Sequence, residues 1–199
     1  MSTINVMIGG VGGQGTVLAS KLLAAAAMEA SLNVRTTETI GMAQRGGSVV
    51  SHVRMGAEVY SPLIPLKSAQ LLLALEPAEG VRLTPYLAPG GLLIVCDRAI
   101  KPVTASLSGS AYNGADMTAW LTENRVNAVI LDGEALVQSA GVKALNVALL
   151  GAAAESGKLP FPAEALESII CTKVPAKFRE MNMTAFSAGK ELYHDCKPA

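Results

Sequence analysis

The segment that most constrains the fold lies near the N-terminus, where an apolar strand, a glycine cluster and a helix follow one another. The glycines form the motif Gly10-x-Gly12-x-x-Gly15, which follows the apolar run 4–8 and precedes an alanine-rich helical pattern. Glycine lets the chain turn tightly without a Cβ clash, so that backbone N–H groups can face a ligand. The helix adds its own unsatisfied N–H groups and the positive end of its dipole. The segment therefore predicts a strand–turn–helix unit that can bind an anion through its backbone.

The rest of the chain alternates strand and helix patterns. We expect strands at residues 4–8, 33–38, 48–55, 69–75, 92–96 and 128–131. We expect helices at residues 15–30, 77–86, 134–140, 142–156, 163–170 and 176–193, and a short helix around Trp120 with Asn113 or Asp116 as its cap. Residues 39–47 and 89–91 are predicted turns. The strand at 48–55 alternates apolar and polar residues, which is typical of an antiparallel strand with one wetter face.

This alternation predicts one α/β domain over residues 1–199. We expect a three-layer, Rossmann-like, doubly wound and mostly parallel (mixed) sheet with a helical C-terminal portion. Half of the residues are hydrophobic and only 16% are charged, as a sheet covered on both faces requires. So few charges also favour large contacts with other subunits.

Charge and cysteine content exclude several function classes. Sixteen basic and sixteen acidic residues give no net charge and form no basic cluster, which argues against a nucleic-acid partner. No signal peptide and no membrane-spanning stretch are visible, so we expect a cytoplasmic protein without a membrane partner. The cysteines Cys96, Cys171 and Cys196 do not have the spacing of a zinc or iron–sulfur site. We therefore expect reduced thiols and no metal on this chain.

The glycine loop alone leaves several functions open. A dinucleotide site needs an acidic residue at the end of the second strand to hold a ribose, and Glu38 stands there. A nicotinamide-dependent dehydrogenase is thus one possible function, and a tight turn that binds nothing is another. A P-loop is excluded, because Gly15-Thr16 lacks the lysine that reaches the terminal phosphates.

A second glycine-rich segment, residues 41–48, follows the second strand. Loops after the first two strands of a doubly wound sheet lie near each other at one edge. Arg45 can offer paired donors to a phosphate or carboxylate, or pair with an acid on this chain or a partner. The two loops together give the predicted ligand-binding residues: Gly10, Gly12, Gly13, Gln14, Gly15, Thr16, Gln44, Arg45, Gly46, Gly47 and Ser48.

No catalytic residue is predicted on this chain. His52 lies on a strand next to Arg54 and is typical of a histidine that is satisfied within a sheet. Asp132 is predicted to cap a helix, because the thiamine-type metal motif around it is incomplete. No Ser-His-Asp or Cys-His order along the sequence indicates a catalytic group.

At this point the residues show a family resemblance. The segments GGVGGQGTVLASKLL, ETIGMAQRGGSVVSHVRMG and YSPLIP resemble the gamma-type subunit of 2-oxoacid:ferredoxin oxidoreductases. Within that family they are most similar to the beta subunit of indolepyruvate ferredoxin oxidoreductase. The likeness continues through LLALEP and residues 146–151 and 181–186, and so covers almost the whole chain.

The resemblance implies a subunit of an enzyme, inactive when isolated. Such complexes decarboxylate 2-oxoacids on thiamine diphosphate, pass electrons through iron–sulfur clusters to ferredoxin, and usually transfer the acyl group to coenzyme A. It implies that thiamine diphosphate, Mg and the clusters are held by partner subunits. Our hypothesis for this chain is a partial coenzyme A site at residues 10–16 and 44–48, whose loops suit a phosphate-bearing ligand. An interaction module that kept the fold and lost the ligand is the remaining alternative.

Overall fold

A six-stranded mixed sheet forms the centre of the structure. The computed structural model describes residues 3–40, 47–101 and 111–196. The strands are β1 (Ile4–Val11), β2 (Asn33–Ile40), β3 (Ser48–Gly56), β4 (Ala69–Ala74), β5 (Leu87–Cys96) and β6 (Ala128–Leu131). Their order is β2-β3-β1-β4-β5-β6, and β3 runs antiparallel to both of its neighbours while the remaining pairs are parallel. The predicted mostly parallel, mixed sheet is confirmed.

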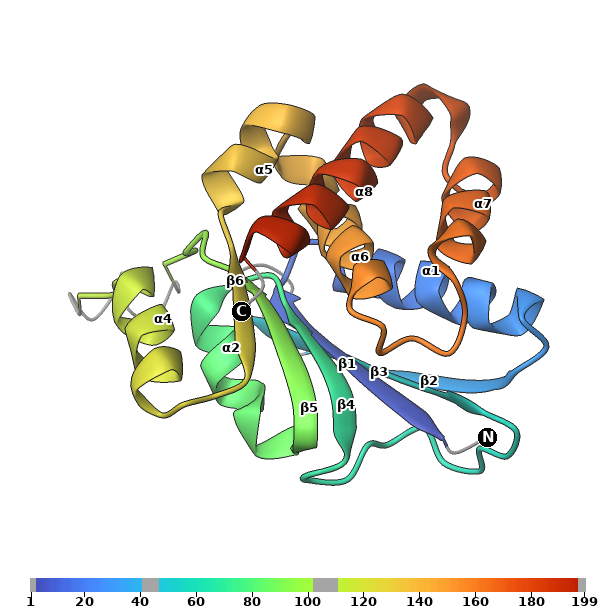
Figure 1. The fold of residues 1–199 in the computed structure, drawn as a ribbon, viewed down its shortest axis with the longest axis horizontal. Coiled ribbons are helices and arrows are strands. Elements are labelled where there is room, and N and C mark those ends of the chain that lie inside the picture. The colour runs from blue at the N-terminus through green and yellow to red at the C-terminus, as the bar shows by residue number, and fades with distance from the viewer. Residues whose placement is uncertain (1–2, 41–46, 102–110, 197–199) are drawn as a thin grey trace.

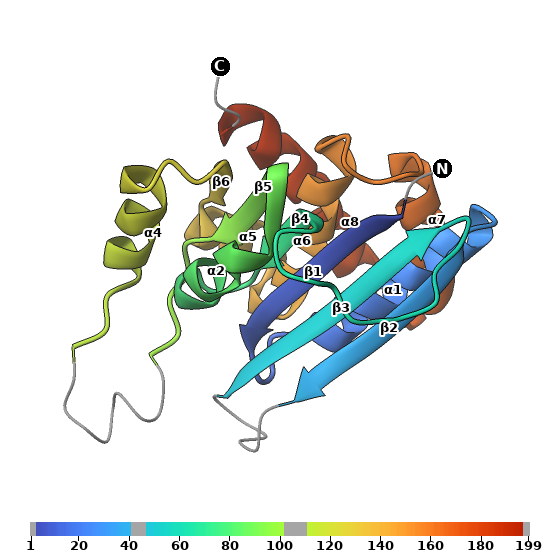
Figure 2. The same ribbon diagram turned by 90° about the horizontal axis from the view of Figure 1, so that it is seen from below.

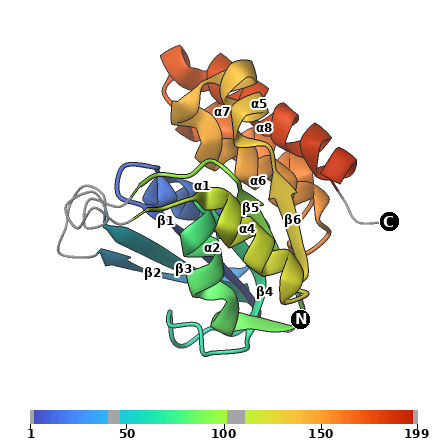
Figure 3. The same cartoon turned by 90° about the vertical axis from the view of Figure 1, so that its left-hand side faces the viewer.

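Helices cover both faces of this sheet, so the predicted three layers are confirmed (Figure 1). The helices are α1 (Thr16–Glu29), α2 (Pro77–Leu83), α4 (Gly114–Glu123), α5 (Gly133–Ala140), α6 (Leu145–Glu155), α7 (Ala163–Lys173) and α8 (Ala176–Cys196), with 3-10 turns at Thr84–Tyr86 and Val142–Ala144. Figure 3 shows the C-terminal helices α5, α7 and α8 gathered on one side of the sheet. Within the described residues no single helix is long and apolar enough to cross a membrane; only the bent pair α5 and Val142–Glu155, taken together at 107°, meets that criterion.

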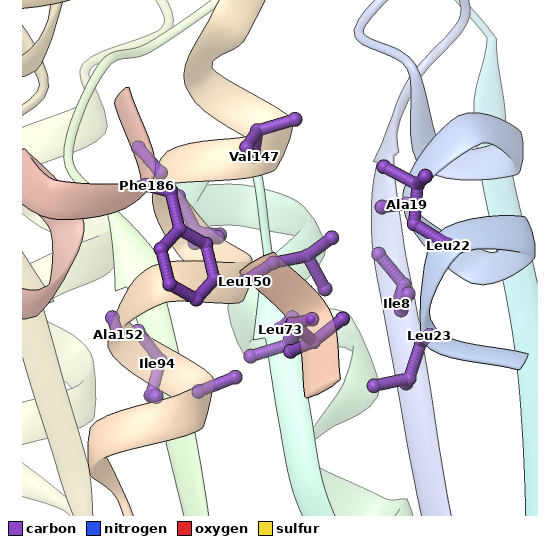
Figure 4. Close-up of a cluster of buried hydrophobic side chains, with 14 of the residues drawn as sticks. Ile8, Ala19, Leu22, Leu23, Leu73, Ile94, Val147, Leu150, Ala152 and Phe186 are labelled. Carbon is purple, nitrogen blue, oxygen red and sulfur yellow. The ribbon is translucent and has the colours of Figure 1, made fainter. Parts of the chain in front are cut away.

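The main core lies between the sheet and helices α1, α6 and α8. Alternate residues of the central strands, such as Ile8 and Leu73, point to this side and are buried. Helix α1 presents leucines and small alanines to them, and α8 contributes Phe186, which is fully buried (Figure 4). Because small side chains allow α1 to lie close to the strands, the alanine-rich helix after the glycine loop has a packing role.

Helices α6 and α8 approach each other unusually closely. A Cβ built on Gly151 would lie 2.0 Å from the Phe186 carbonyl oxygen, and one built on Gly189 would lie 1.8 Å from the Ala148 carbonyl oxygen. Both distances are far below van der Waals contact, and both neighbours are backbone atoms. The two glycines are therefore required for this helix pair to pack.

Some predicted boundaries were wrong. Residues 89–91 were predicted as a turn but lie inside β5. Pairing there jumps from Ala69–Leu87 to Leu71–Leu92, so the Pro-Gly-Gly stretch forms an irregularity in a strand that continues. Residues 39 and 40 were expected in a turn but belong to β2, which extends to Ile40. The expected helix 142–156 begins as a 3-10 turn before α6.

Candidate functional site

The glycine loop between β1 and α1 forms the turn that its sequence predicts. Gly13 and Gly15 have φ angles of +102° and +84°, a left-handed conformation that side chains with a Cβ rarely adopt. Two loop amides are used internally: Gly12 N–H donates to the Gly47 carbonyl at 2.8 Å, and Gln14 N–H donates to the Val11 carbonyl at 3.0 Å. The loop is therefore a closed, hydrogen-bonded turn in which only part of the backbone faces outward.

Gln14 holds the loop against the neighbouring strand. Its Oε1 accepts from Val11 N–H at 2.6 Å, and its Nε2 donates to the carbonyl of Leu75 at 2.8 Å. Gln14 was predicted to bind a ligand, but both ends of its side chain make internal hydrogen bonds. Its place in the site is to position the loop.

The N-terminus of α1 offers the unsatisfied donors of the site. Gly15 is the N-cap and makes no side-chain cap, and the first turn of α1 has no acidic residue. Within the described part of the chain, the amides of Gly13, Thr16 and Val17 have no hydrogen-bond partner. Thr16 is buried as a whole residue, so its N–H group is shielded as well as its side chain. This end of the helix can attract and bind an anion.

Asn146 completes the back of the loop, although the sequence had given it no role. It lies in the first turn of α6, is 2% exposed, and its Nδ2 donates to the Gly15 carbonyl at 3.1 Å. Its Oδ1 is buried without a partner among the described residues. A Cβ on Gly15 would lie 2.7 Å from Asn146 Nδ2, so the side chain packs directly on the glycine. A polar residue near the start of a helix that is apolar up to Glu155 was the available sequence signal.

The described end of the second predicted loop, Gly47 and Ser48, contacts the first loop. Gly47 accepts from Gly12 N–H, and Ser48 pairs with Val11 across the β1–β3 ladder. The two loops were expected to meet as the ends of parallel strands, but they meet because β3 is antiparallel and starts beside the end of β1. Ser48 Oγ donates to Glu79 Oε2 at 2.6 Å, so its hydroxyl is already engaged. The predicted residues Gln44, Arg45 and Gly46 lie outside the described residues.

A buried carboxylate lies beside the loop, at the end of β4. Glu76 is 2% exposed and caps α2, accepting from Ala78 N–H at 2.8 Å and Glu79 N–H at 3.2 Å. Its other oxygen accepts from Ile100 N–H at 3.4 Å and from the Tyr112 hydroxyl. Burial and the nearby carboxylate raise the pKa of Tyr112 above its usual range, so this hydroxyl stays protonated and donates. Glu76 therefore links three segments at the carboxyl end of the sheet: the start of α2, Ile100 after β5 and Tyr112 before α4.

Glu38 does not reach the glycine loop. It lies on β2, which is separated from β1 by β3, and strands in a sheet are about 4.8 Å apart, so β2 is about 10 Å from β1. Its carboxylate accepts from Ser20 Oγ at 3.3 Å. A ribose ligand beside the phosphate site would require β2 to be adjacent to β1. The geometry therefore disfavours the dinucleotide interpretation.

Other chemically active side chains serve the fold. His52 accepts from Ile64 N–H through Nδ1 at 3.2 Å, which confirms a histidine satisfied within the sheet. Asp132 accepts from the amides of Glu134 and Ala135 at 2.9 Å, which confirms the predicted cap. Burial raises the pKa of Cys96 to about 11. Among the described residues, no three His, Cys, Asp or Glu side chains form a group that could hold a metal ion.

Sequence comparison assigns relatives over nearly the full chain. The family profile described as pyruvate ferredoxin/flavodoxin oxidoreductase matches residues 5–192. The chain is 38% identical over 192 residues to indolepyruvate oxidoreductase subunit IorB of Pyrococcus horikoshii, covering 95% of both chains. It is 37% identical over 192 residues to the same subunit of Thermococcus kodakarensis, again with 95% coverage of both.

Solved structures show the same fold. The gamma subunit of a keto/oxoacid ferredoxin oxidoreductase from Geobacter sulfurreducens matches with a TM-score of 0.73, 22% identity and complete coverage of both chains. A 2-oxoglutarate:ferredoxin oxidoreductase from Magnetococcus marinus, with 2-oxoglutarate, coenzyme A and succinyl-CoA bound, matches with a TM-score of 0.71 and 18% identity. The match covers the whole of this chain and 32% of that one, so this fold forms one part of a larger polypeptide there.

Proposed function

Since this chain belongs to the pyruvate ferredoxin/flavodoxin oxidoreductase family, we propose that its glycine loop and the N-terminus of α1 hold a phosphate group of coenzyme A within the assembled enzyme. The chain is a subunit of a 2-oxoacid ferredoxin oxidoreductase of the indolepyruvate type. Its own contribution is to bind and orient the acyl acceptor, while the 2-oxoacid reacts on another subunit.

The observation that carries this proposal is the N-terminus of α1, which lies behind the exposed Gly13 and has amides without a partner among the described residues. The amides of Gly13 and Val17, which have no partner among the described residues, favour an anion, and no acidic side chain in the first turn of α1 competes for them. A Cβ on Gly13 would meet nothing within 4 Å, so there is room for a ligand. Coenzyme A carries phosphates that such a site can bind.

The remaining cofactors are assigned to partner chains. We infer that thiamine diphosphate, Mg and the iron–sulfur clusters are held by the subunit or subunits that assemble with this chain, and that ferredoxin receives electrons from them. Thiamine diphosphate would supply the decarboxylation chemistry, and coenzyme A would accept the acyl group. We also propose a cytoplasmic location, where free thiols such as the three cysteines here remain reduced.

A matched pair of variants at Gly13 tests the phosphate site. Gly13→Asp and Gly13→Asn have the same size, and both side chains tolerate positive φ better than most. The aspartate places a negative charge before the helix, so we expect the assembled complex to bind coenzyme A at least tenfold more weakly with Asp than with Asn, about 1.4 kcal/mol. Calorimetric titration measures this difference, which should shrink at high salt.

Pantetheine is the control ligand, because it lacks the phosphates of coenzyme A. Its affinity should be the same for the two Gly13 variants. Equal affinities of the Asp and Asn complexes for coenzyme A would exclude a phosphate at this helix. They would favour an interaction module whose glycine loop has only a structural role.

A further inference from the structure

Among the described helices, only α1 packs over the full width of the β2–β3 half of the sheet, and it covers one face alone. Strands β2 and β3 pack against α1 on one side, whereas α2 and α4 lie on the other side mainly over β1 and β4–β6, and α2 reaches β3 near its start, where Glu79 accepts from Ser48 Oγ. Figure 2 shows this surface directly: β2 and β3 lie in front of α1, and no helix lies in front of them. We call the side of β2 and β3 that faces away from α1 the open face.

Register identifies the residues of the open face. Val53 and Met55 of β3 are buried in the core beside α1, so the alternate residues point the other way. Cross-strand partners share a face, which adds the matching positions of β2. The open face is formed by Arg35, Thr37 and Thr39 of β2 and by Val50, His52 and Arg54 of β3. These six positions carry two arginines and no carboxylate.

The connection between β3 and β4 crosses part of the open face and is held there by side chains. Arg54 donates through Nη1 to the carbonyls of Ser61 and Leu63, at 2.9 and 3.2 Å, and through Nε to Asn5 Oδ1 at 2.9 Å. Ile64 is buried and donates its N–H to His52. The connection is therefore anchored to the sheet.

The same connection directs large apolar side chains outward. Tyr60, Leu63 and Leu66 are 86%, 60% and 61% exposed, within seven residues of one another. Exposed apolar groups on an anchored segment are typical of a protein contact. They lie next to the basic open face, and Lys67 is also exposed there.

A pocket lies beside the anchored connection, between the open face and α2. It has a volume of about 350 Å³ and an apolar floor formed by Met7, Val50 and Leu83. Its polar lining consists of Thr39, His52, Arg82 and Tyr86. His52 accepts through Nδ1, so its proton lies on Nε2, and burial lowers its pKa, which keeps the ring neutral. The lining supplies hydrogen-bond donors and a cation, but no carboxylate.

The charged side chains around the pocket and the open face indicate which kind of partner surface would bind there. The guanidinium of Arg82 is largely exposed and, as far as the structure describes the chain, pairs only with the buried Glu79, at 3.4 Å. Arg35 is exposed and forms no ion pair within the described residues. Glu58, which accepts from the Tyr60 hydroxyl, is the acidic exception on the connection. In a chain of zero net charge, this basic and apolar area complements an acidic and apolar surface.

We propose that the open face and the connection 57–68 dock the thiamine-binding subunit, through a segment of that subunit that carries acidic and apolar side chains. An acidic side chain of the segment enters the pocket at Arg82, and its apolar side chains cover Tyr60 and Leu63. The inference rests on the proposed function, because it takes its partner from there.

Two matched pairs of variants test the docking surface by measuring the affinity of the purified chain for the thiamine-binding subunit. Arg35→Glu and Tyr60→Asp should each raise Kd at least tenfold. Arg35→Lys keeps the charge and should bind within twofold of the unmodified chain. Trp120→Asp, on α4 at the opposite edge of the sheet, should also bind within twofold. Circular dichroism verifies that all four variants are folded.

The outcomes separate this inference from the proposed function. Unchanged affinity of Arg35→Glu and Tyr60→Asp would overturn the docking surface. It would not affect the proposed coenzyme A site, which the titration of the Gly13 variants tests separately. Self-association of the chain that Arg35→Glu abolishes, with unchanged binding of the other subunit, would also overturn it in favour of a second copy. Failure of the unmodified chain to bind a thiamine-containing subunit would instead contradict the proposed function.

Discussion

Gly189→Ala is expected to lower the free energy of unfolding by about 3 kcal/mol. The new Cβ would lie 1.8 Å from the Ala148 carbonyl oxygen, and a backbone atom cannot move aside as a flexible side chain can. Helices α6 and α8 would have to separate along their contact. The Phe186 side chain of α8, which is buried in the core beside the sheet, would then lose part of its packing.

Chemical denaturation measures this loss, and Ser187→Ala is the matched control. Ser187 lies on the exposed side of the same helix, so its replacement should change stability by less than about 0.5 kcal/mol. In an ordinary helix interior, glycine to alanine stabilises by about 1 kcal/mol. A Gly189→Ala variant with unchanged or increased stability would show that the two helices do not approach as closely as the structure indicates.

Glu76→Ala is expected to lower the free energy of unfolding by about 3 kcal/mol. The substitution removes the cap of α2 and leaves the Tyr112 hydroxyl and the Ile100 amide without their acceptor. These groups are partly buried, so their lost hydrogen bonds are not fully replaced by water. The loss should also loosen the end of β4, against which Gln14 holds the glycine loop.

Asp132→Ala is the control that measures the loss of a helix cap alone, without the long-range hydrogen bonds that Glu76 also makes. Asp132 caps α5 through two amides in the same way, but it is exposed and has no comparable partners from other segments. Its removal should cost about 1 kcal/mol, as for an ordinary cap. Thermal unfolding of both variants should therefore show a clearly larger shift for Glu76→Ala. Equal shifts would mean that Glu76 acts as a cap alone.

Local sequence patterns predicted most of the fold, because strand alternation, helix caps and tight turns depend on residues that are close in sequence. The apolar runs that became β1 and β4, the alternating residues of β3 and the cap Asp132 were identified from neighbouring residues, and Asn113 was one of two predicted caps of α4. The tight turn at Gly13 and Gly15 followed from the need for positive φ. The mixed character of the sheet was also expected, since the alternation at residues 48–55 favours an antiparallel strand.

Long-range features could not be predicted in this way. Strand β3 lies between β2 and β1, and this strand order cannot be predicted from local sequence patterns. It moves Glu38 away from the glycine loop. Asn146 meets Gly15 across 131 residues, and Arg54 anchors a connection whose path depends on the assembled sheet. The engagement of the Gln14 and Ser48 side chains likewise depends on tertiary neighbours.

Hydrogen–deuterium exchange of the assembled complex tests the coenzyme A site most directly. The amides of residues 12–18 should exchange more slowly when coenzyme A is added, because the N–H groups at the start of α1 that have no partner in the described structure then bind phosphate. Pantetheine, which has no phosphate, should leave their exchange unchanged. If coenzyme A protects other segments of the complex while residues 12–18 exchange at the same rate, the glycine loop of this chain does not hold the cofactor.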